Sequence, residues 1–128
     1  LPPPLFPMDI QTTKYEVWIW LFRQLEQNSN YEVLILDLGD GVTDLYQILD
    51  YCTEIYVPIR QDLMSLAKLE QFENALQMWD SVSVLEKMKK IRIPFYAAGK
   101  SGKAWFEELA WSELGDYVRK ILRGEDGG

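Results

Sequence analysis

Gly99, Lys100 and Ser101 stand together in the sequence, and the chemistry that this group could do is phosphate binding. Phosphate-binding loops follow the pattern G-x-x-x-x-G-K-[ST] between a strand and a helix, and their backbone N–H groups cradle the phosphates. The first glycine of that pattern falls at Pro94. Proline has a fixed φ and no N–H, so it cannot make the first turn of such a loop. We therefore expect a solvated turn in this stretch.

Acidic and glycine residues follow an apolar run at residues 37–41, which read Asp-Leu-Gly-Asp-Gly. Two further apolar runs end in residues 60–62 and 96–99. In open α/β sheets, ligands bind at the carboxyl ends of the strands. These three segments are therefore the places where we expect a ligand.

Residue types that are missing exclude several kinds of catalysis. The chain has no histidine, which removes Ser-His-Asp and Cys-His catalysis and most zinc sites. Its one cysteine, Cys52, cannot form a disulfide within the chain, which suits a cytoplasmic protein, and we interpret it as a small core residue. Any chemistry must use carboxylates, lysine, arginine, hydroxyls or a metal that arrives with the ligand.

Composition and charge indicate a folded, acidic protein. The 128 residues are 48% hydrophobic and 26% charged, which is typical of a globular domain. The formal net charge of −7 gives no general attraction for nucleic acid, so we expect no direct nucleic-acid partner. No apolar run approaches the roughly 18 residues of a transmembrane segment.

The elements that must position these residues alternate between helices and strands. Apolar runs predict buried parallel strands at 33–37, 55–59 and 91–95, because a strand that is apolar on both faces lies between helices. Helical patterns occur in residues 9–30, 43–52, 64–90 and 103–124, the last possibly broken at Gly115. This order predicts a three-layer, doubly wound α/β fold with a mostly parallel sheet. We expect residues 1–128 to form one unit, with 1–10 as an extended, proline-rich arm.

Residues 31–72 resemble the middle of the ParA/MinD-type ATPases, which include pilus-assembly ATPases of the CpaE kind. Residues 89–95 resemble a later strand of that family, which ends in Ile-Pro near the adenine pocket, and 113–122 resemble its closing helix. The residues that match the family pattern in 31–72 are Tyr31-Glu32, Asp37, Gly41, Thr53-Glu54, Asp62 and Ser65-Leu66.

The resemblance implies a role for each candidate site residue. Asp37 stands where the family keeps its Walker B aspartate, which holds Mg²⁺ through a water molecule. Asp40 and Gly41 would lie on the nucleotide side, and Pro94 and Phe95 beside the adenine.

The family's lysine-bearing phosphate loop is absent from this sequence, and nothing else in it would cradle the phosphates. The chain would then be the C-terminal portion of a cytoplasmic ATP-binding domain and inactive alone. Its parent would use ATP and Mg²⁺ to switch partner contacts in pilus or secretion assembly, or in partitioning.

Two other interpretations stay open. The stretches VLILDLGDG, IPFYAAG and LGDYVRK resemble response-regulator receivers, in which Asp37 would accept a phosphoryl group and Lys100 or Lys120 would be the paired lysine. The separation of Asp37 from Pro94 is too long for that family, by one strand–helix unit. The other interpretation is an inert α/β interaction module. Its partners would be other proteins or a second copy, bound through an uncovered region of the sheet where some of the five tryptophans are exposed.

Overall fold

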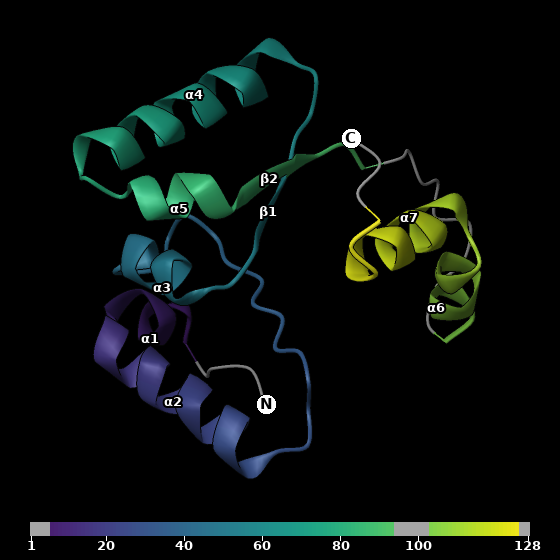
Figure 1. Cartoon of the computed structure of the whole chain (residues 1–128), viewed down its shortest axis with the longest axis horizontal. Coiled ribbons are helices and arrows are strands. Elements are labelled where there is room, and N and C mark those ends of the chain that lie inside the picture. The colour runs from purple at the N-terminus through teal and green to yellow at the C-terminus, as the bar shows by residue number, and fades with distance from the viewer. Residues whose placement is uncertain (1–5, 94–102, 126–128) are drawn as a thin grey trace. The chain divides into compact units, whose positions relative to one another are not determined.

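The computed structural model describes residues 6–93 and 103–125. These residues form a mixed α/β structure that is mostly helical and has a small parallel sheet of two strands (Figure 1). Its internal contacts divide the chain into two compact units. The first comprises Leu1–Ile55 and Ala67–Lys89, and the second comprises Tyr56–Leu66 and Lys90–Gly128. This division does not test whether residues 1–128 form a single unit, which remains a prediction.

The chain's first described element is helical. Helix α1 spans Pro7–Thr12 and helix α2 spans Tyr15–Asn28. Pro7 is tolerated at the start of α1 because the first N–H of a helix has no intrahelical partner and the fixed φ of proline suits the first turn. Residues 7–10 are therefore helical, which corrects the extended arm predicted for 1–10, and residues 1–5 lie outside the described part.

The core of the first unit lies where α2 meets α3, which spans Leu45–Tyr51. Ile19 and Phe22 of α2 and Ile48 of α3 are buried together. Tyr51 of α3 also donates a hydrogen bond of 2.7 Å from its hydroxyl to Glu26 Oε1. Helix α3 contacts α5 as well, which spans Val82–Lys87, so α3 is the element that joins the helices of this unit (Figure 1).

Helix α4 spans Leu63–Met78 and ends sooner than the sequence predicts. It begins with an aspartate cap, since Asp62 Oδ1 accepts the N–H of Ser65 at 2.9 Å. Asp80 then adopts a left-handed conformation with φ of 53°, which a helix cannot continue through. The single helix expected over 64–90 is therefore two helices, α4 and α5, with a turn at residues 79–81.

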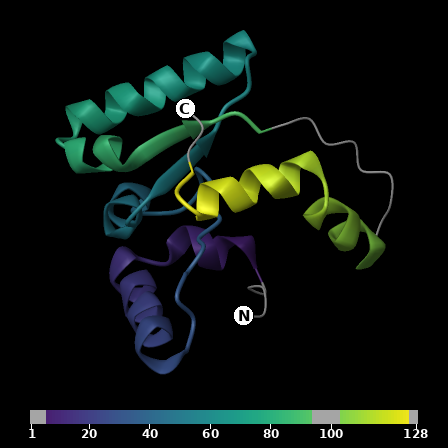
Figure 2. The same cartoon turned by 45° about the vertical axis from the view of Figure 1, so that its right-hand side comes forward.

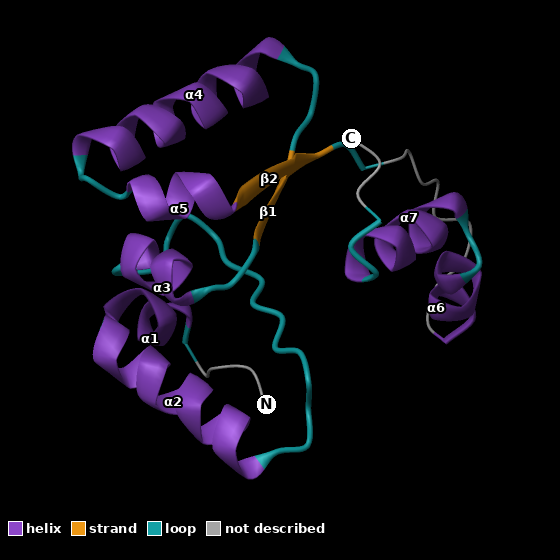
Figure 3. Ribbon diagram, in the orientation of Figure 1, coloured by secondary structure: helices purple, strands orange, loops and turns teal. Residues whose placement is uncertain are grey.

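The sheet has two strands, β1 at Ile55–Pro58 and β2 at Met88–Ile91 (Figure 3). Just beyond β1, the N–H of Ile59 donates to the carbonyl of Ile91 at 2.9 Å. The strand predicted at 55–59 is confirmed over 55–58. The strand predicted at 91–95 is wrong in its bounds: β2 begins at Met88, directly after α5, and ends at Ile91, while residues 94–95 lie outside the described part. The mixed α/β class is confirmed, and the three-layer, doubly wound sheet remains a prediction.

The apolar segment 33–37 is not a strand in the structure, which corrects the third strand expectation. Its side chains are covered only toward its C-terminal end. Leu36 and Leu38 pack against the core cluster around Ile48. Val33, Leu34 and Ile35 are 65%, 43% and 76% exposed. The first part of the segment therefore stays uncovered, instead of being buried on both faces.

The second unit contains a helical hairpin of α6, Lys103–Ala110, and α7, Glu113–Leu122 (Figure 2). Ser112 caps α7, since its Oγ accepts the N–H of Gly115 at 3.2 Å. Arg119 reaches back across the turn and donates to the carbonyl of Ala110 at 2.6 Å. The break predicted at Gly115 lies instead at residues 111–112, because the serine cap starts a new helix there.

Gly115 allows the two helices of this hairpin to approach closely. A Cβ at this position would lie 2.5 Å from the carbonyl oxygen of Ala110 and 2.6 Å from that of Leu109. Gly115→Ala should destabilise the hairpin by about 1–3 kcal/mol, the usual cost of forced overpacking. Helix propensity alone predicts the opposite sign, a gain of roughly 0.5–1 kcal/mol.

Amide hydrogen exchange in residues 113–122 measures this effect. We expect faster exchange in Gly115→Ala than in the wild type, and little change in the control variant Lys120→Ala, whose side chain is exposed on α7. Slower exchange in Gly115→Ala would show that propensity outweighs the steric overlap.

Among the described helices, none is both long and apolar enough to cross a membrane.

Candidate functional site

The structure places three of the five predicted site residues in one stretch of the first unit. Asp37 is exposed and stands between Leu36 and Leu38, which pack against the core. Asp40 and Gly41 follow in a turn that precedes α3. Pro94 and Phe95 lie outside the described residues, as do Lys100 and the rest of the glycine-lysine-serine stretch.

The turn that carries Asp40 and Gly41 is fixed to the junction between α1 and α2. Asp44 accepts the N–H of Tyr15 on its Oδ2 at 3.0 Å, and so caps the start of α2 from a distant part of the chain. The hydroxyl of Thr43 donates to the carbonyl of Gln11 in α1. Asp44 has φ of 57°, a left-handed conformation that is uncommon outside glycine. These contacts hold the acidic turn in one position relative to α2 and α3.

Beside the turn is an open hollow of about 360 Å³ within the first unit. Tyr46 of α3 stacks on Phe72 of α4, with ring centroids 5.8 Å apart and 24° between the planes. The same tyrosine meets Trp79 in a T-shaped contact, with centroids 4.7 Å apart and 75° between the planes. The residues that line the hollow are Asp40, Val42, Asp44, Leu45, Tyr46, Gln47, Phe72 and Trp79.

The carboxylates of this stretch, such as Asp37, could provide only some of the ligands of a Mg²⁺ ion. In residues 6–93 and 103–125, no group of three or more histidine, cysteine, aspartate or glutamate side chains could hold a metal ion. Mg²⁺ usually binds through one or two carboxylates and takes its other ligands from water and substrate phosphates. An exposed Asp37 fits that pattern, because it leaves the remaining positions to water and to a nucleotide.

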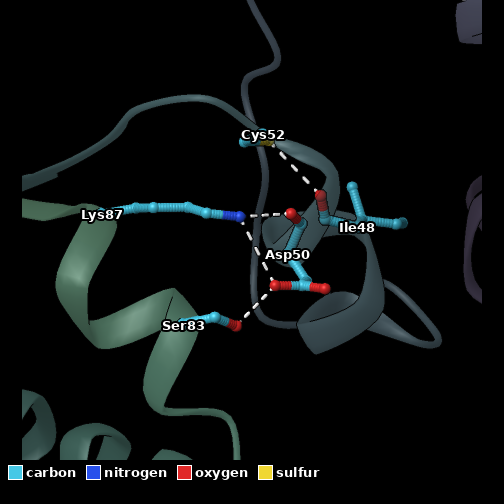
Figure 4. A network of polar contacts seen from close by, with 5 residues as sticks. All are labelled: Ile48, Asp50, Cys52, Ser83 and Lys87. Carbon is cyan, nitrogen blue, oxygen red and sulfur yellow. Dashed lines mark hydrogen bonds and ion pairs between the residues drawn. The ribbon is translucent and has the colours of Figure 1, made fainter.

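A separate polar cluster links α3 to α5 (Figure 4). Ser83 donates to Asp50 Oδ1 at 2.6 Å, and the ammonium of Lys87 lies 3.4 Å from the same oxygen. Lys87 also donates to the backbone carbonyl of Asp50 at 2.5 Å, beside the C-terminal end of α3. Cys52 donates weakly to the carbonyl of Ile48 at 3.4 Å. The cluster joins elements and has the character of a structural contact.

This cluster shifts two pKa values in opposite directions. The hydrogen bond from Ser83, together with the charge of Lys87, lowers the pKa of Asp50. Burial raises the pKa of the Cys52 thiol, against an opposing effect of Lys87. Cys52 is half-buried and largely protonated at neutral pH, which agrees with its interpretation as an unreactive packing residue.

The lowered pKa of Asp50 gives stability a pH dependence. Because the folded-state pKa lies below the ordinary value, the contribution is complete above about pH 4 and is lost as pH falls through the folded-state pKa. Between about pH 5 and pH 2, the free energy of unfolding should fall more for the wild type than for Asp50→Asn. Glu70→Gln, which changes an exposed carboxylate on α4, is the matched control. Identical pH profiles for Asp50→Asn and wild type would contradict the assignment.

Several residues around the acidic turn cannot be recognised as site residues from the sequence. Asp44 and Tyr46 belong to no motif, and Phe72 and Trp79 stand at helical spacing within the single helix predicted over 64–90. Phe72 is half-buried as that pattern predicts, but Trp79 is 65% exposed because α4 ends just before it. The only signal in the sequence was the aromatic spacing of Phe72 and Trp79, which is also typical of core residues.

Comparisons with protein-family models, curated proteins and solved structures find no match to this chain.

Proposed function

We propose that the chain is the C-terminal portion of an ATP-binding domain of ParA/MinD type. It contributes the carboxylate of Asp37 toward Mg²⁺, and Pro94 and Phe95 toward the adenine. The parent protein is cytoplasmic and switches its protein contacts with the bound nucleotide, in pilus or secretion assembly or in partitioning. The phosphate-binding loop lies in a segment that these 128 residues do not include.

The observation that carries the proposal is the exposure of the aliphatic residues 33–35. Val33 and Ile35 are 65% and 76% exposed, although both are aliphatic and β-branched. Burying a side chain of this kind is worth about 1.5–3 kcal/mol, so leaving both in water is costly. In a complete three-layer domain, a neighbouring strand and helix would cover them, and the segment would be an inner strand of the sheet.

The position of Asp37 supports the same proposal. Asp37 follows Ile35 by two positions, and alternate residues would share a face if the segment were an inner strand of the complete sheet. The element that covers Val33 and Ile35 would therefore also lie near Asp37. In doubly wound folds, the loop after a neighbouring strand holds the ligand at this end of the sheet. Mg²⁺ bound there would offset the negative charge of the nucleotide phosphates.

The role of Asp37 toward Mg²⁺ is positional. A carboxylate that acts through a water molecule orients that water and needs no direct bond to the metal. The fixed turn after it, held by Asp44 and Thr43, keeps Asp40 and Gly41 in one place. A lysine and a ring of backbone N–H groups for the phosphates would be supplied by the phosphate-binding half.

A second candidate function is an inert α/β interaction module. It is favoured by the exposed aromatic residues of the helical hairpin, where Trp111 is 85% exposed and Phe106 is 64% exposed. Exposed apolar surface often marks a protein–protein contact. In this alternative Asp37 has no catalytic task, so nucleotide experiments separate the two candidates.

Calorimetric titration of the 128-residue chain with ATP and Mg²⁺ tests the proposal. Without the phosphate-binding half, we expect a Kd weaker than about 0.1 mM, corresponding to roughly −5.5 kcal/mol, and no ATP hydrolysis. A control titration with ATP and EDTA should give no stronger binding than with Mg²⁺. Tight binding or turnover by the isolated chain would show that the site is complete here and that the proposal is wrong.

A further inference from the structure

We propose that the hollow beside α3 binds an organic ammonium cation. The hollow shares Asp40 with the proposed nucleotide side of the acidic turn, but binding of the cation requires neither ATP nor Mg²⁺. Its volume of about 360 Å³ is near the lower end for ligand pockets, which suits a small ligand or a single side chain.

The rings that line the hollow select for a cation. The ring planes of Tyr46 and Trp79 stand at 75° to each other, and the ring of Phe72 stacks on that of Tyr46. Aromatic faces carry negative electrostatic potential and attract alkylated ammonium groups, most strongly at tryptophan. Two rings close to perpendicular can contact such a group from two directions. Trp79 is 65% exposed, so its ring is accessible from solvent.

Two carboxylates in the lining favour a ligand with a positive charge. Asp40 and Asp44 both line the hollow. One oxygen of Asp44 already accepts the N–H of Tyr15, which fixes the side chain in place. Asp40 and Asp44 take no part in the ion pairs between described residues, which include that of Lys87 with Asp50 and that of Arg119 with Asp116. Negative charge beside aromatic rings favours a positively charged ligand and disfavours a neutral or anionic one.

Choline is the probe that tests the site, with 3,3-dimethyl-1-butanol as its neutral counterpart of the same shape. The indole N–H resonance of Trp79, assigned from a Trp79→Phe variant, reports binding in the full chain at constant ionic strength. We expect choline to shift this resonance saturably and the neutral alcohol to leave it unchanged. Trp79→Ala should weaken choline binding, measured by calorimetry, about five- to thirtyfold.

Three variants distinguish choline binding in the hollow from nonspecific binding elsewhere on the protein. Asp40→Asn should weaken choline binding by about fivefold, the effect of one exposed charge. Trp20→Ala removes a tryptophan that is 62% exposed on α2 and outside the hollow, and should leave binding unchanged. Trp79→Phe keeps a ring and should retain more binding than Trp79→Ala. Far-UV circular dichroism confirms that each variant is folded.

A peptide pair distinguishes a free cation from a side chain of a partner. If a short peptide that contains trimethyl-lysine binds more tightly than choline, the ligand is a side chain of a partner. The same peptide with acetyl-lysine is the neutral control. Choline binding at least as tightly as the peptide would identify a small free cation. The proposal is overturned if the wild type binds neither cation, if the neutral counterparts bind equally well, or if Trp79→Ala and Trp20→Ala behave alike.

Discussion

Ile48→Ala should lower the free energy of unfolding of the first unit by about 2–5 kcal/mol, the range for removing a buried aliphatic side chain and leaving a cavity. Ile48 is only 1% exposed and packs with Ile19 and Phe22 at the junction of α2 and α3. Because α3 also contacts α5, the loss should reach the whole unit. This is the largest stability effect that we expect from a single side chain.

Two matched variants control for this effect. Ile48→Val should cost only about 0.5–1.5 kcal/mol, since one methylene is removed. Val17→Ala changes a 56% exposed side chain on α2 and should stay within about 0.5 kcal/mol. Urea unfolding followed by circular dichroism measures all three. A change below about 0.5 kcal/mol for Ile48→Ala would contradict the core assignment.

Ile48 is also the residue that connects the acidic turn to the core. Leu36, Leu38 and Val42 pack against the cluster that includes Ile48, and they flank Asp37 and Asp40 in the sequence. Loss of Ile48 should therefore loosen the segment that carries the candidate site. Faster amide exchange at residues 36–42 in Ile48→Ala would show this coupling.

Local patterns predicted α2 and α3 of the first unit, but they predicted neither α1 nor the break between α4 and α5. The helix ending at Asn28 and the short helix before Cys52 follow directly from apolar spacing and from the polar residues that stop them. The cap of α2 could not be predicted, because Asp44 supplies it from a distant part of the chain. Thr12 and Thr13 stand just before α2 but do not cap it, since their hydroxyls donate to carbonyls of α1.

The strands were less predictable, because a strand requires a partner that the local sequence does not specify. The segment 55–58 finds its partner in β2. The segment 33–37 has an equally apolar sequence but forms no strand in the structure. Its apolar character is a local property, whereas hydrogen bonding to a neighbour depends on the rest of the sheet.

In the candidate site, too, local features could be predicted from the sequence and contacts between distant residues could not. The acidic turn at Asp37 and Asp40 was visible in the sequence, because acidic and glycine residues after an apolar run are distinctive. The aromatic hollow was not, because it needs Tyr46 from α3 and Trp79 from the end of α4 to meet. The exposure of Trp79 follows from the left-handed Asp80, a feature that helical spacing does not predict.

Asp37→Asn should slow ATP hydrolysis in the full-length protein by about 10- to 100-fold, the usual cost of losing a residue that orients a metal ligand. The substitution keeps the shape of the side chain and removes its charge, so Mg²⁺ would lose the carboxylate that holds its water. Asp37 is exposed, and the fold should therefore remain intact. Circular dichroism and the thermal midpoint check that it does.

Steady-state ATP turnover of the full-length protein, with and without Asp37→Asn, tests the nucleotide role most directly. Glu32→Gln serves as the matched control, because Glu32 is an exposed carboxylate in the same segment. We expect turnover by the wild type and by Glu32→Gln at similar rates, and a rate for Asp37→Asn that is about 10- to 100-fold lower, which corresponds to about 1.4–2.7 kcal/mol in the barrier. Equal turnover by Asp37→Asn and the wild type would contradict the role of Asp37.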